Sequence, residues 1–420
     1  MTDTDDRRTV NTVHGAPETL VQAGIVHGDV HITSGPAQSP NVPRQLPLPT
    51  NGFVDRKAQL RRLDELAREA ATSVPIVILA GQPGVGKSAL AVRWAHHARP
   101  HFPDGDLYVN MYGHTSGPRA QASQALDTVL RALGVPTDRI PLDVDARSAL
   151  FRSEVHGKNL LLVIDDVFDA AQARPLLPSS LGCMVVITSR STLSGLVARE
   201  GAQRLPLSEL PQSDSLDLLR NTIGARVDSQ PQAARSLAGH CAHLPLALRL
   251  AAERLMDRPD AELSDLVNEL AAEESRLDAL SEEDELSDLR AVMATSYQAL
   301  DTATARFFRL LGAHPGPDFS VLAAAALTDT TPAEAGRMLD RLVRANLVER
   351  PRTTRYRLHD LVRLYAVERV RLQDGQEATA KAVGRAARWY THAAARAQLT
   401  EHPHFPVVPG TEPPEGLPEF

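Results

Sequence analysis

Short apolar runs alternate with longer amphipathic stretches in the first half of the chain. The five candidate strands are residues 76–80, 106–111, 160–164, 184–188 and 203–205. Stretches such as 88–98 and 121–133, which lie between these runs, carry the periodicity of helices. Strands that are apolar on both faces and alternate with helices are typical of a parallel sheet covered on both sides. The pattern predicts an α/β domain.

Beyond residue 208 the strand pattern gives way to helical periodicity. The predicted helices are residues 214–223, 232–242, 246–256, 261–271, 289–300, 302–312, 320–327, 331–345, 361–372 and 379–399. Thr331, Pro332 and Glu334 form a capping-box pattern that fixes the start of one of them. The predicted hairpin strands are residues 347–350 and 355–359. Helices that are closed by a small hairpin look like a winged helix.

Composition limits the possible partners and the setting. The chain of 420 residues has 45 basic and 52 acidic residues, a net charge of −7, so it has no global positive field for nucleic acid or an anionic membrane. Cys183 and Cys241 cannot form a disulfide framework, which favours a reducing, cytoplasmic setting. No apolar run reaches the ~20 residues of a membrane span, and the polar first eight residues do not predict a secretory signal.

Residues 81–88, Gly-Gln-Pro-Gly-Val-Gly-Lys-Ser, match the phosphate-binding loop pattern and lie between an apolar strand and a helix. The glycines lack Cβ atoms, so the loop can curl with its N–H groups aimed at a phosphate, next to the helix N-terminus. Lys87 would neutralise β- and γ-phosphate oxygens, and Ser88 would ligate Mg²⁺. The candidate nucleotide-binding residues here are Gly81, Gly84, Val85, Gly86, Lys87, Ser88 and Ala89.

Two carboxylates follow the apolar run at 160–164, at the edge of the sheet where the phosphate loop lies. We expect Asp165 to bind Mg²⁺, directly or through water, and Asp166 to polarise the attacking water. Arg190 ends the next strand, where it could contact a γ-phosphate and distinguish ATP from ADP. Acidic turns and a surface arginine are the structural alternatives for these residues.

Seven motifs in order resemble the NB-ARC branch of the STAND signal-transducing ATPases, in particular the large NB-ARC regulators of actinobacteria. The motifs are residues 52–56, 81–88, 108–110, 161–167, 188–190, 243–247 and 358–362. The resemblance covers about residues 51–366. It implies a switch in which ADP locks a closed monomer, exchange for ATP permits self-association, and slow Mg²⁺-dependent hydrolysis resets the protein.

The resemblance also implies roles for residues outside the phosphate loop. Phe53, Val54 and Arg56 would border adenine, Pro245 would pack on the base, and His359 would reach the β-phosphate of ADP. The structural alternatives are that Pro245 starts a helix and that His359 ends a strand. The chain departs from the family at Asp55, where glycine is usual, and in lacking the long sensor repeats that follow the winged helix in relatives.

These observations predict six segments. They are a flexible signalling segment with a Pro-rich linker (1–50), the nucleotide-binding domain (51–207), a helical domain (208–275), a winged helix (288–360), C-terminal helices (361–402) and a disordered tail (403–420). Eight acidic residues and one arginine between residues 273 and 288 favour a hinge there.

The N-terminal segment carries its own hypothesis. Apolar residues alternate between residues 21 and 32 with one change of register, as in a short strand pair that could stack with copies of itself. Residues 21–24, Val-Gln-Ala-Gly, resemble the core of RHIM-like amyloid signalling motifs. A disordered tail or an edge strand explains this segment equally well.

Two classes of function remain open. An ADP/ATP switch is favoured. The alternative is a DNA-binding regulator acting through the winged helix, where seven arginines gather: Arg337, Arg341, Arg344, Arg350, Arg352, Arg355 and Arg357. The same arginines could instead be a solvated face, or a surface that holds the nucleotide-binding domain closed.

Overall fold

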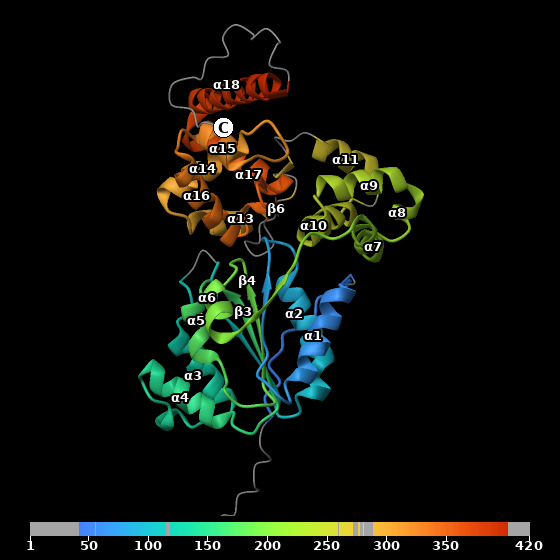
Figure 1. The fold of residues 1–420 in the computed structure, drawn as a ribbon. Helices are drawn as coiled ribbons and strands as arrows, with labels where there is room; N and C mark the ends of the chain where they lie inside the picture. The colour runs from blue at the N-terminus through green and yellow to red at the C-terminus, as the bar shows by residue number, and fades with distance from the viewer. Residues whose placement is uncertain are drawn as a thin grey trace, which may run out of the picture. The chain divides into compact units, whose positions relative to one another are not determined.

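A five-stranded parallel sheet forms the first half of the protein, as the alternation of strands and helices predicts. The computed structural model describes residues 42–54, 56–114, 118–258, 260–271, 276–277, 280 and 289–401 (Figure 1). The strands are β1 (Ile76–Ala80), β2 (Gly105–Asn110), β3 (Leu160–Val167), β4 (Met184–Ser189) and β5 (Gln203–Pro206). Their order in the sheet is β2-β3-β4-β1-β5. The α/β fold class is therefore confirmed.

Helices cover both faces of this sheet because alternate residues of its central strands point to opposite sides. On one face, Val77 and Leu79 of β1 pack with Trp94; on the other, Ile78 packs in a separate cluster with Leu126. The helices of this half are α1 (Lys57–Glu69), α2 (Lys87–Ala98), α3 (Ala122–Ala132), α4 (Val144–Glu154), α5 (Ala170–Ala173) and α6 (Ser194–Glu200). Three single turns of 3-10 helix are Arg99–His101, Thr137–Arg139 and Arg174–Leu176.

A group of helices follows β5. Its members are α7 (Gln212–Ile223), α8 (Arg226–Ser229), α9 (Pro231–His240), α10 (Pro245–Met256) and α11 (Leu263–Ala271). The longer of them agree with the predicted helices to within a few residues. Pro245 occupies the first position of α10, where the missing N–H of proline leaves no helical hydrogen bond unmade.

The last described region contains helices and one antiparallel hairpin. Its elements are α13 (Leu289–Gln298), α14 (Thr302–Gly312), α15 (Val321–Thr328), α16 (Pro332–Arg344), β6 (Glu349–Arg352), β7 (Arg355–Arg357), α17 (Asp360–Gln373) and α18 (Gly375–Glu401). The capping box is confirmed: the Thr331 N–H donates to the Glu334 carboxylate over 3.0 Å, and the Glu334 N–H donates to the Thr331 hydroxyl over 3.3 Å.

Several predictions concern residues that the structure does not describe. The strand pair at 21–32 with its RHIM-like motif, Asp55, most of the acidic stretch at 273–288 and the Pro-rich end after 401 all lie outside the described residues. The six segment boundaries remain predictions. None of the described helices combines the length and the apolar character that crossing a membrane requires.

The last part of the Pro-rich stretch is held against the edge strand β2. Arg44 forms a parallel bridge with Asp106, and the Asp106 N–H donates to the Pro43 carbonyl over 2.9 Å. The Asp106 side chain is fully buried and accepts hydrogen bonds from Arg44 and Arg99, each over 2.9 Å. The segment leading to the sheet is therefore fixed to β2 by one buried carboxylate shared between two arginines.

This carboxylate gives a prediction about stability. Asp106→Asn removes a buried charge that two arginines face, so we expect the free energy of unfolding to fall by about 2 to 3 kcal/mol. The matched control is Asp127→Asn on α3, which breaks a partly exposed ion pair with Arg131 and a longer contact with Arg147, and which should cost less than about 1 kcal/mol. Urea unfolding of both variants measures the difference, and equal losses would contradict the assignment.

Candidate functional site

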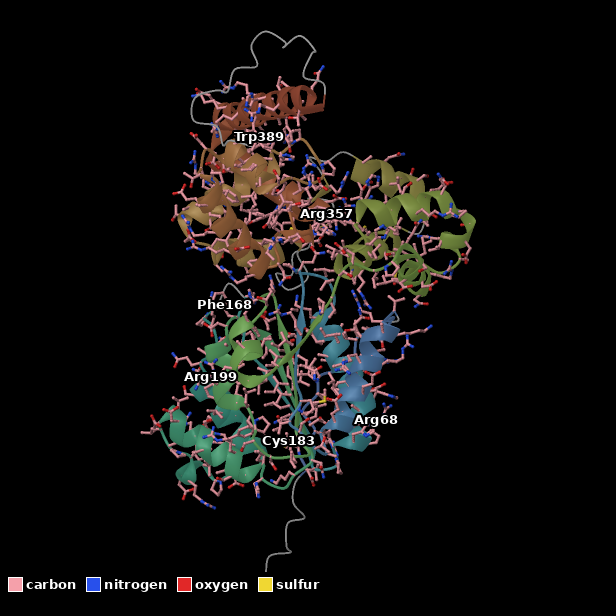
Figure 2. The ribbon with its side chains drawn as sticks, in the orientation of Figure 1. Arg68, Phe168, Cys183, Arg199, Arg357 and Trp389 are labelled. Carbon is pink, nitrogen blue, oxygen red and sulfur yellow. The ribbon has the colours of Figure 1, made fainter. Side chains whose placement is uncertain are left out.

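The phosphate loop lies at the carboxyl ends of the strands, between β1 and α2. Gly86 precedes α2 with φ of 92°, a left-handed conformation that glycine adopts without strain. A Cβ on Gly81 would lie 2.5 Å from the Leu207 carbonyl oxygen, so the strand and the segment after β5 approach too closely for a side chain. Figure 2 shows Phe168, after the end of β3, and Cys183, before the start of β4, at opposite ends of the sheet. The loop belongs to the Phe168 end.

Lys87 is folded back onto its own loop. Its Nζ donates to the carbonyl oxygens of Gly81 and Gln82 over 2.8 and 2.9 Å. Burial is the main reason that the pKa of Lys87 is lowered to about 7, and the nearby positive charge of Arg190 lowers it further. A phosphate in the loop would supply the negative charge that favours the ammonium form, so this lysine is set to bind an anion.

A cavity of about 690 Å³ opens in front of the loop. Its lining includes eight of the candidate residues: Gly84, Gly86, Lys87, Ser88, Ala89, Asp166, Arg190 and Pro245. It also includes residues of the two later regions, among them Leu246 and Arg249 from α10 and Thr295 from α13. The candidates that do not line it are Phe53, Val54, Arg56, Gly81, Val85, Asp165 and His359.

Three of these remaining candidates, Phe53, Val54 and Arg56, lie in the segment before α1. Phe53 and Val54 are half-buried and pack against the core on the α2 side of the sheet. Arg56 is buried, and its guanidinium donates to the Val85 carbonyl over 2.9 Å. This hydrogen bond ties the segment before α1 to the middle of the phosphate loop, whose conformation it helps to fix.

Asp165 is buried at the end of β3, and two hydroxyl groups bind its carboxylate. Tyr108 donates to one oxygen over 2.7 Å, and Thr188 donates to the other. Burial and the nearby Asp165 charge raise the pKa of Tyr108, which keeps the phenol protonated and able to donate. The donors Ser88 and Asp165 suit Mg²⁺, which binds few protein oxygens and keeps several waters. As placed, Asp165 would act on the ion through water.

Asp166 follows in a left-handed conformation, with φ of 50°. Both of its carboxylate oxygens accept from one residue: the His114 backbone N–H donates over 2.9 Å, and the ring Nδ1 lies 2.8 Å away. Burial alone would raise the pKa of Asp166, but the His114 hydrogen bonds and the Arg190 charge lower it overall. The carboxylate is therefore held ionised in one orientation.

Arg190 faces away from the sheet toward α13. Its guanidinium donates to the Thr295 and Ser296 hydroxyls over 2.9 and 3.1 Å, while its backbone carbonyl accepts from the Asn346 side chain over 2.7 Å. Burial lowers the pKa of Arg190, and the charge of Asp166 opposes this effect. One residue at the end of β4 thus connects the nucleotide loop region with α13 and with the segment after α16.

His359 reaches the phosphate loop only through another residue. Its Nε2 lies 3.2 Å from the Glu209 carboxylate and 3.2 Å from the Ala242 carbonyl. The Gln82 side chain donates to the same Glu209 oxygen over 3.2 Å. His359 is buried, and within the described residues its Nδ1 has no hydrogen-bond partner. Glu209 therefore bridges the loop and the segment before α17.

The helical group touches the loop directly at α10. The Leu246 N–H donates to the Gly84 carbonyl over 3.3 Å, and Pro245 is the nearest neighbour of a Cβ placed on Gly86, at 3.8 Å. Arg249 donates to the Gly52 carbonyl over 3.2 Å. The first turn of α10 thus covers one side of the cavity.

Sequence reasoning missed four residues that hold the site together, namely His114, Glu209, Arg249 and Asn346. None belongs to a short motif with a chemical signature, and their partners lie between 52 and 198 positions away. Proximity of His114 to the candidate site is the one cue in the sequence, since it follows strand residues 106–111. The sequence around Glu209, Arg249 and Asn346 carries no comparable cue.

Comparison with known proteins agrees with this geometry. Residues 52–208 match the sequence family described as an AAA ATPase domain. The chain is 42% identical to the regulatory protein AfsR of Streptomyces griseus over 327 residues, which are 77% of this chain and 33% of that protein. It is 26% identical to the disease resistance-like protein DSC1 of Arabidopsis thaliana, over 62% of this chain and 21% of that protein. The chain therefore combines a match to an ATPase domain with similarity to a regulatory protein.

The chain also has a low similarity to a solved structure. That structure is the STAND protein with a tetratricopeptide repeat sensor from Pyrococcus horikoshii, 18% identical, with a TM-score of 0.35 over 87% of this chain and 51% of that one. The chain spans about a third of the length of the Streptomyces protein that it matches.

The Glu209 bridge predicts how stability depends on pH. The hydrogen bond with His359 is the main reason that the pKa of Glu209 lies well below the usual value of about 4.3. A depressed carboxylate pKa stabilises the folded state above about pH 5, and this contribution is lost as pH falls through the folded pKa. We expect Glu209→Gln to be less stable than wild type at pH 7, with the difference shrinking between pH 5 and pH 3. Urea unfolding at several pH values measures this.

The control for that series is Glu65→Gln, which removes an exposed carboxylate of α1 that pairs with Arg62. Its difference from wild type should stay small across the same range, because exposed pairs contribute little. A Glu209→Gln difference that is constant with pH would contradict the charged bridge.

Proposed function

We propose that the protein is an ADP/ATP-dependent molecular switch of the STAND type. The observation that carries this proposal is the composition of the cavity wall: the phosphate loop supplies Lys87 and Ser88, α10 supplies Pro245, and α13 supplies Thr295. A ligand in this cavity contacts three regions that are far apart in the sequence. Its binding free energy therefore depends on how those regions are arranged, which is the requirement for a ligand-operated switch.

The roles of the individual residues follow from their positions. Lys87 and the loop N–H groups bind the β-phosphate, and Ser88 and Asp165 hold Mg²⁺, which shields phosphate charge. Pro245 packs on the base, with Phe53, Val54 and Arg56 at its edge. His359 acts at the β-phosphate end of the site, where Glu209 now connects it to the loop through Gln82.

ADP is the ligand of the closed form, and ATP the ligand of the open, self-associating form. Arg190 is engaged with Thr295 and Ser296 in the closed arrangement. A γ-phosphate offers this guanidinium a stronger, charged acceptor than two hydroxyls, so ATP competes for Arg190 and weakens its hold on α13. Slow hydrolysis by Lys87, Asp165, Asp166 and Arg190 returns the protein to the ADP form.

The similar proteins support the same function. The matched family is an ATPase domain, and the Streptomyces relative is named as a regulatory protein. An adenine nucleotide that controls the activity of a regulator agrees with both names.

The DNA-binding alternative is less well supported because much of the arginine group has partners inside the chain. Arg341 pairs with Asp301, Arg355 with Asp318 and Arg357 with Glu349. Arginines that already face carboxylates offer less net charge to a phosphate backbone. Salt-dependent binding to duplex DNA would revive this alternative.

Nucleotide retention tests the switch most directly. Lys87→Ala removes the buried ammonium from the loop, so we expect affinity for ADP and ATP to fall at least about 100-fold, since charge-assisted contacts to phosphate are strong. Calorimetric titration with Mg²⁺ present, and mass spectrometry of nucleotide that co-purifies, measure this. Lys158→Ala, before β3 at the other end of the sheet, is the control and should bind as wild type does. Wild type that captures no adenine nucleotide would overturn the proposal.

The closed form gives a second test. His359→Ala removes the side chain that faces Glu209, so we expect ADP release to become about tenfold faster and ATP-dependent self-association to increase. Stopped-flow release of a fluorescent ADP and light scattering with each nucleotide measure these effects. His101→Ala, at an exposed position before β2, should change neither. Unaltered ADP release in the His359 variant would remove His359 from the switch.

A further inference from the structure

His114 occupies a position next to Asp166 that only a glycine neighbour permits. A Cβ on Gly113 would lie 2.4 Å from the Asp166 carbonyl oxygen and 2.6 Å from the Phe168 nitrogen. The Gly113 N–H donates to that same carbonyl over 2.8 Å. The chain after β2 is therefore pressed against the chain after β3, and His114 is placed beside the Asp166 carboxylate by backbone contacts as well as by its ring.

The hydrogen bond between the His114 ring and Asp166 indicates the tautomer of the imidazole. A carboxylate oxygen accepts hydrogen bonds, so the ring nitrogen 2.8 Å from it, Nδ1, carries the hydrogen. In a neutral imidazole the other nitrogen, Nε2, then holds the lone pair. Burial is the main influence on the pKa of His114 and lowers it, which favours this neutral form.

The His114 ring belongs to the nucleotide cavity. His114 lines the same cavity as Lys87, Ser88 and Arg190, and its side chain is only 6% exposed. Among the described residues, the His114 ring forms its hydrogen bond through Nδ1. A basic nitrogen on a mostly buried side chain that lines the cavity, next to the groups expected to bind the γ-phosphate, is in position to accept a proton.

Asp166 is correspondingly poorly placed to act alone. Both of its oxygens accept hydrogen bonds from His114. A carboxylate is ordinarily a weak base near neutral pH, whereas a neutral imidazole is a stronger one. The geometry resembles other sites in which an aspartate orients a histidine that carries out the proton transfer.

We propose that His114 is a catalytic residue of ATP hydrolysis that accepts the proton of the attacking water at Nε2, with Asp166 as the positioning residue that holds its ring. This inference rests on the proposed function. The water oxygen forms a bond to the γ-phosphorus, and the bond from that phosphorus to the β–γ bridging oxygen breaks. The electron pair of that bond stays on ADP, and the water proton moves to Nε2, from which it returns to solvent or phosphate.

Single-turnover hydrolysis of bound ATP tests the assignment. His114→Asn keeps an N–H donor close to the position of Nδ1 but has no base at the position of Nε2. We expect its hydrolysis rate to fall at least about 100-fold, the usual contribution of a general base, while its affinities for ATP and ADP stay within about threefold of wild type. Because ATP then persists, the nucleotide that co-purifies should shift from ADP toward ATP.

Chemical rescue separates a base from a structural support. In His114→Ala, added imidazole should restore hydrolysis in proportion to its concentration, because it can occupy the space of the lost ring. The control variant His101→Asn should hydrolyse ATP at the wild-type rate. Absence of rescue, together with an unchanged rate in His114→Asn, would overturn the proposal and return water activation to Asp166.

Nitrogen NMR of the nucleotide-free protein tests the tautomer without any turnover. We expect the His114 ring to be neutral with its proton on Nδ1, and Asp166→Asn to disturb this state. A proton on Nε2 in wild type would overturn the inference. If wild type binds nucleotide but these tests fail, only the role of His114 is overturned and the proposed switch stands. If wild type binds no adenine nucleotide, the proposed function is overturned, and this inference with it.

Discussion

The structure depends on how the buried positive groups Lys87 and Arg190 are accommodated at the carboxyl end of the parallel sheet. Lys87 meets only carbonyl oxygens there, and Arg190 is drawn to the hydroxyls of α13. Burial lowers the pKa of both groups. A bound nucleotide would offset the free-energy cost of burying these positive charges, first at Lys87. Occupancy of the loop and the arrangement of the distant helices would then be thermodynamically linked.

Two separate contacts carry that linkage from the loop to the last region of the chain. The route through Gln82, Glu209 and His359 involves a charged bridge, while the route through Arg190 and Thr295 involves neutral hydroxyl acceptors. A γ-phosphate acts most strongly on the second route, because charged acceptors outcompete hydroxyls. The first route begins at Gln82, so it responds to the conformation of the phosphate loop. The loop is thus connected to the last region of the chain by two contacts of different chemistry.

Sequence predicted the elements of this fold well because their signals are local. The apolar run of β1 was placed to the residue, and the loop at 81–88 follows a pattern that chemistry restricts tightly. The bridging contacts lacked such a signal. Glu209 and Asn346 look like ordinary surface residues in the sequence, and only the folded chain brings them to partners more than 100 positions away. The local sequence pattern therefore identifies the phosphate-binding loop, whereas only the tertiary structure shows which distant residues contact the site.

The contrast between Asp165 and Asp166 shows why neighbouring carboxylates in one motif need not share a role. Asp165 lies near the end of β3, and its carboxylate accepts hydrogen bonds from the hydroxyls of Tyr108 and Thr188. The carboxylate is therefore suited to orient water around a cation. Asp166 has φ of 50°, which turns its side chain to the His114 side of the strand. The left-handed conformation of Asp166 therefore directs two neighbouring carboxylates to different partners across a single peptide bond.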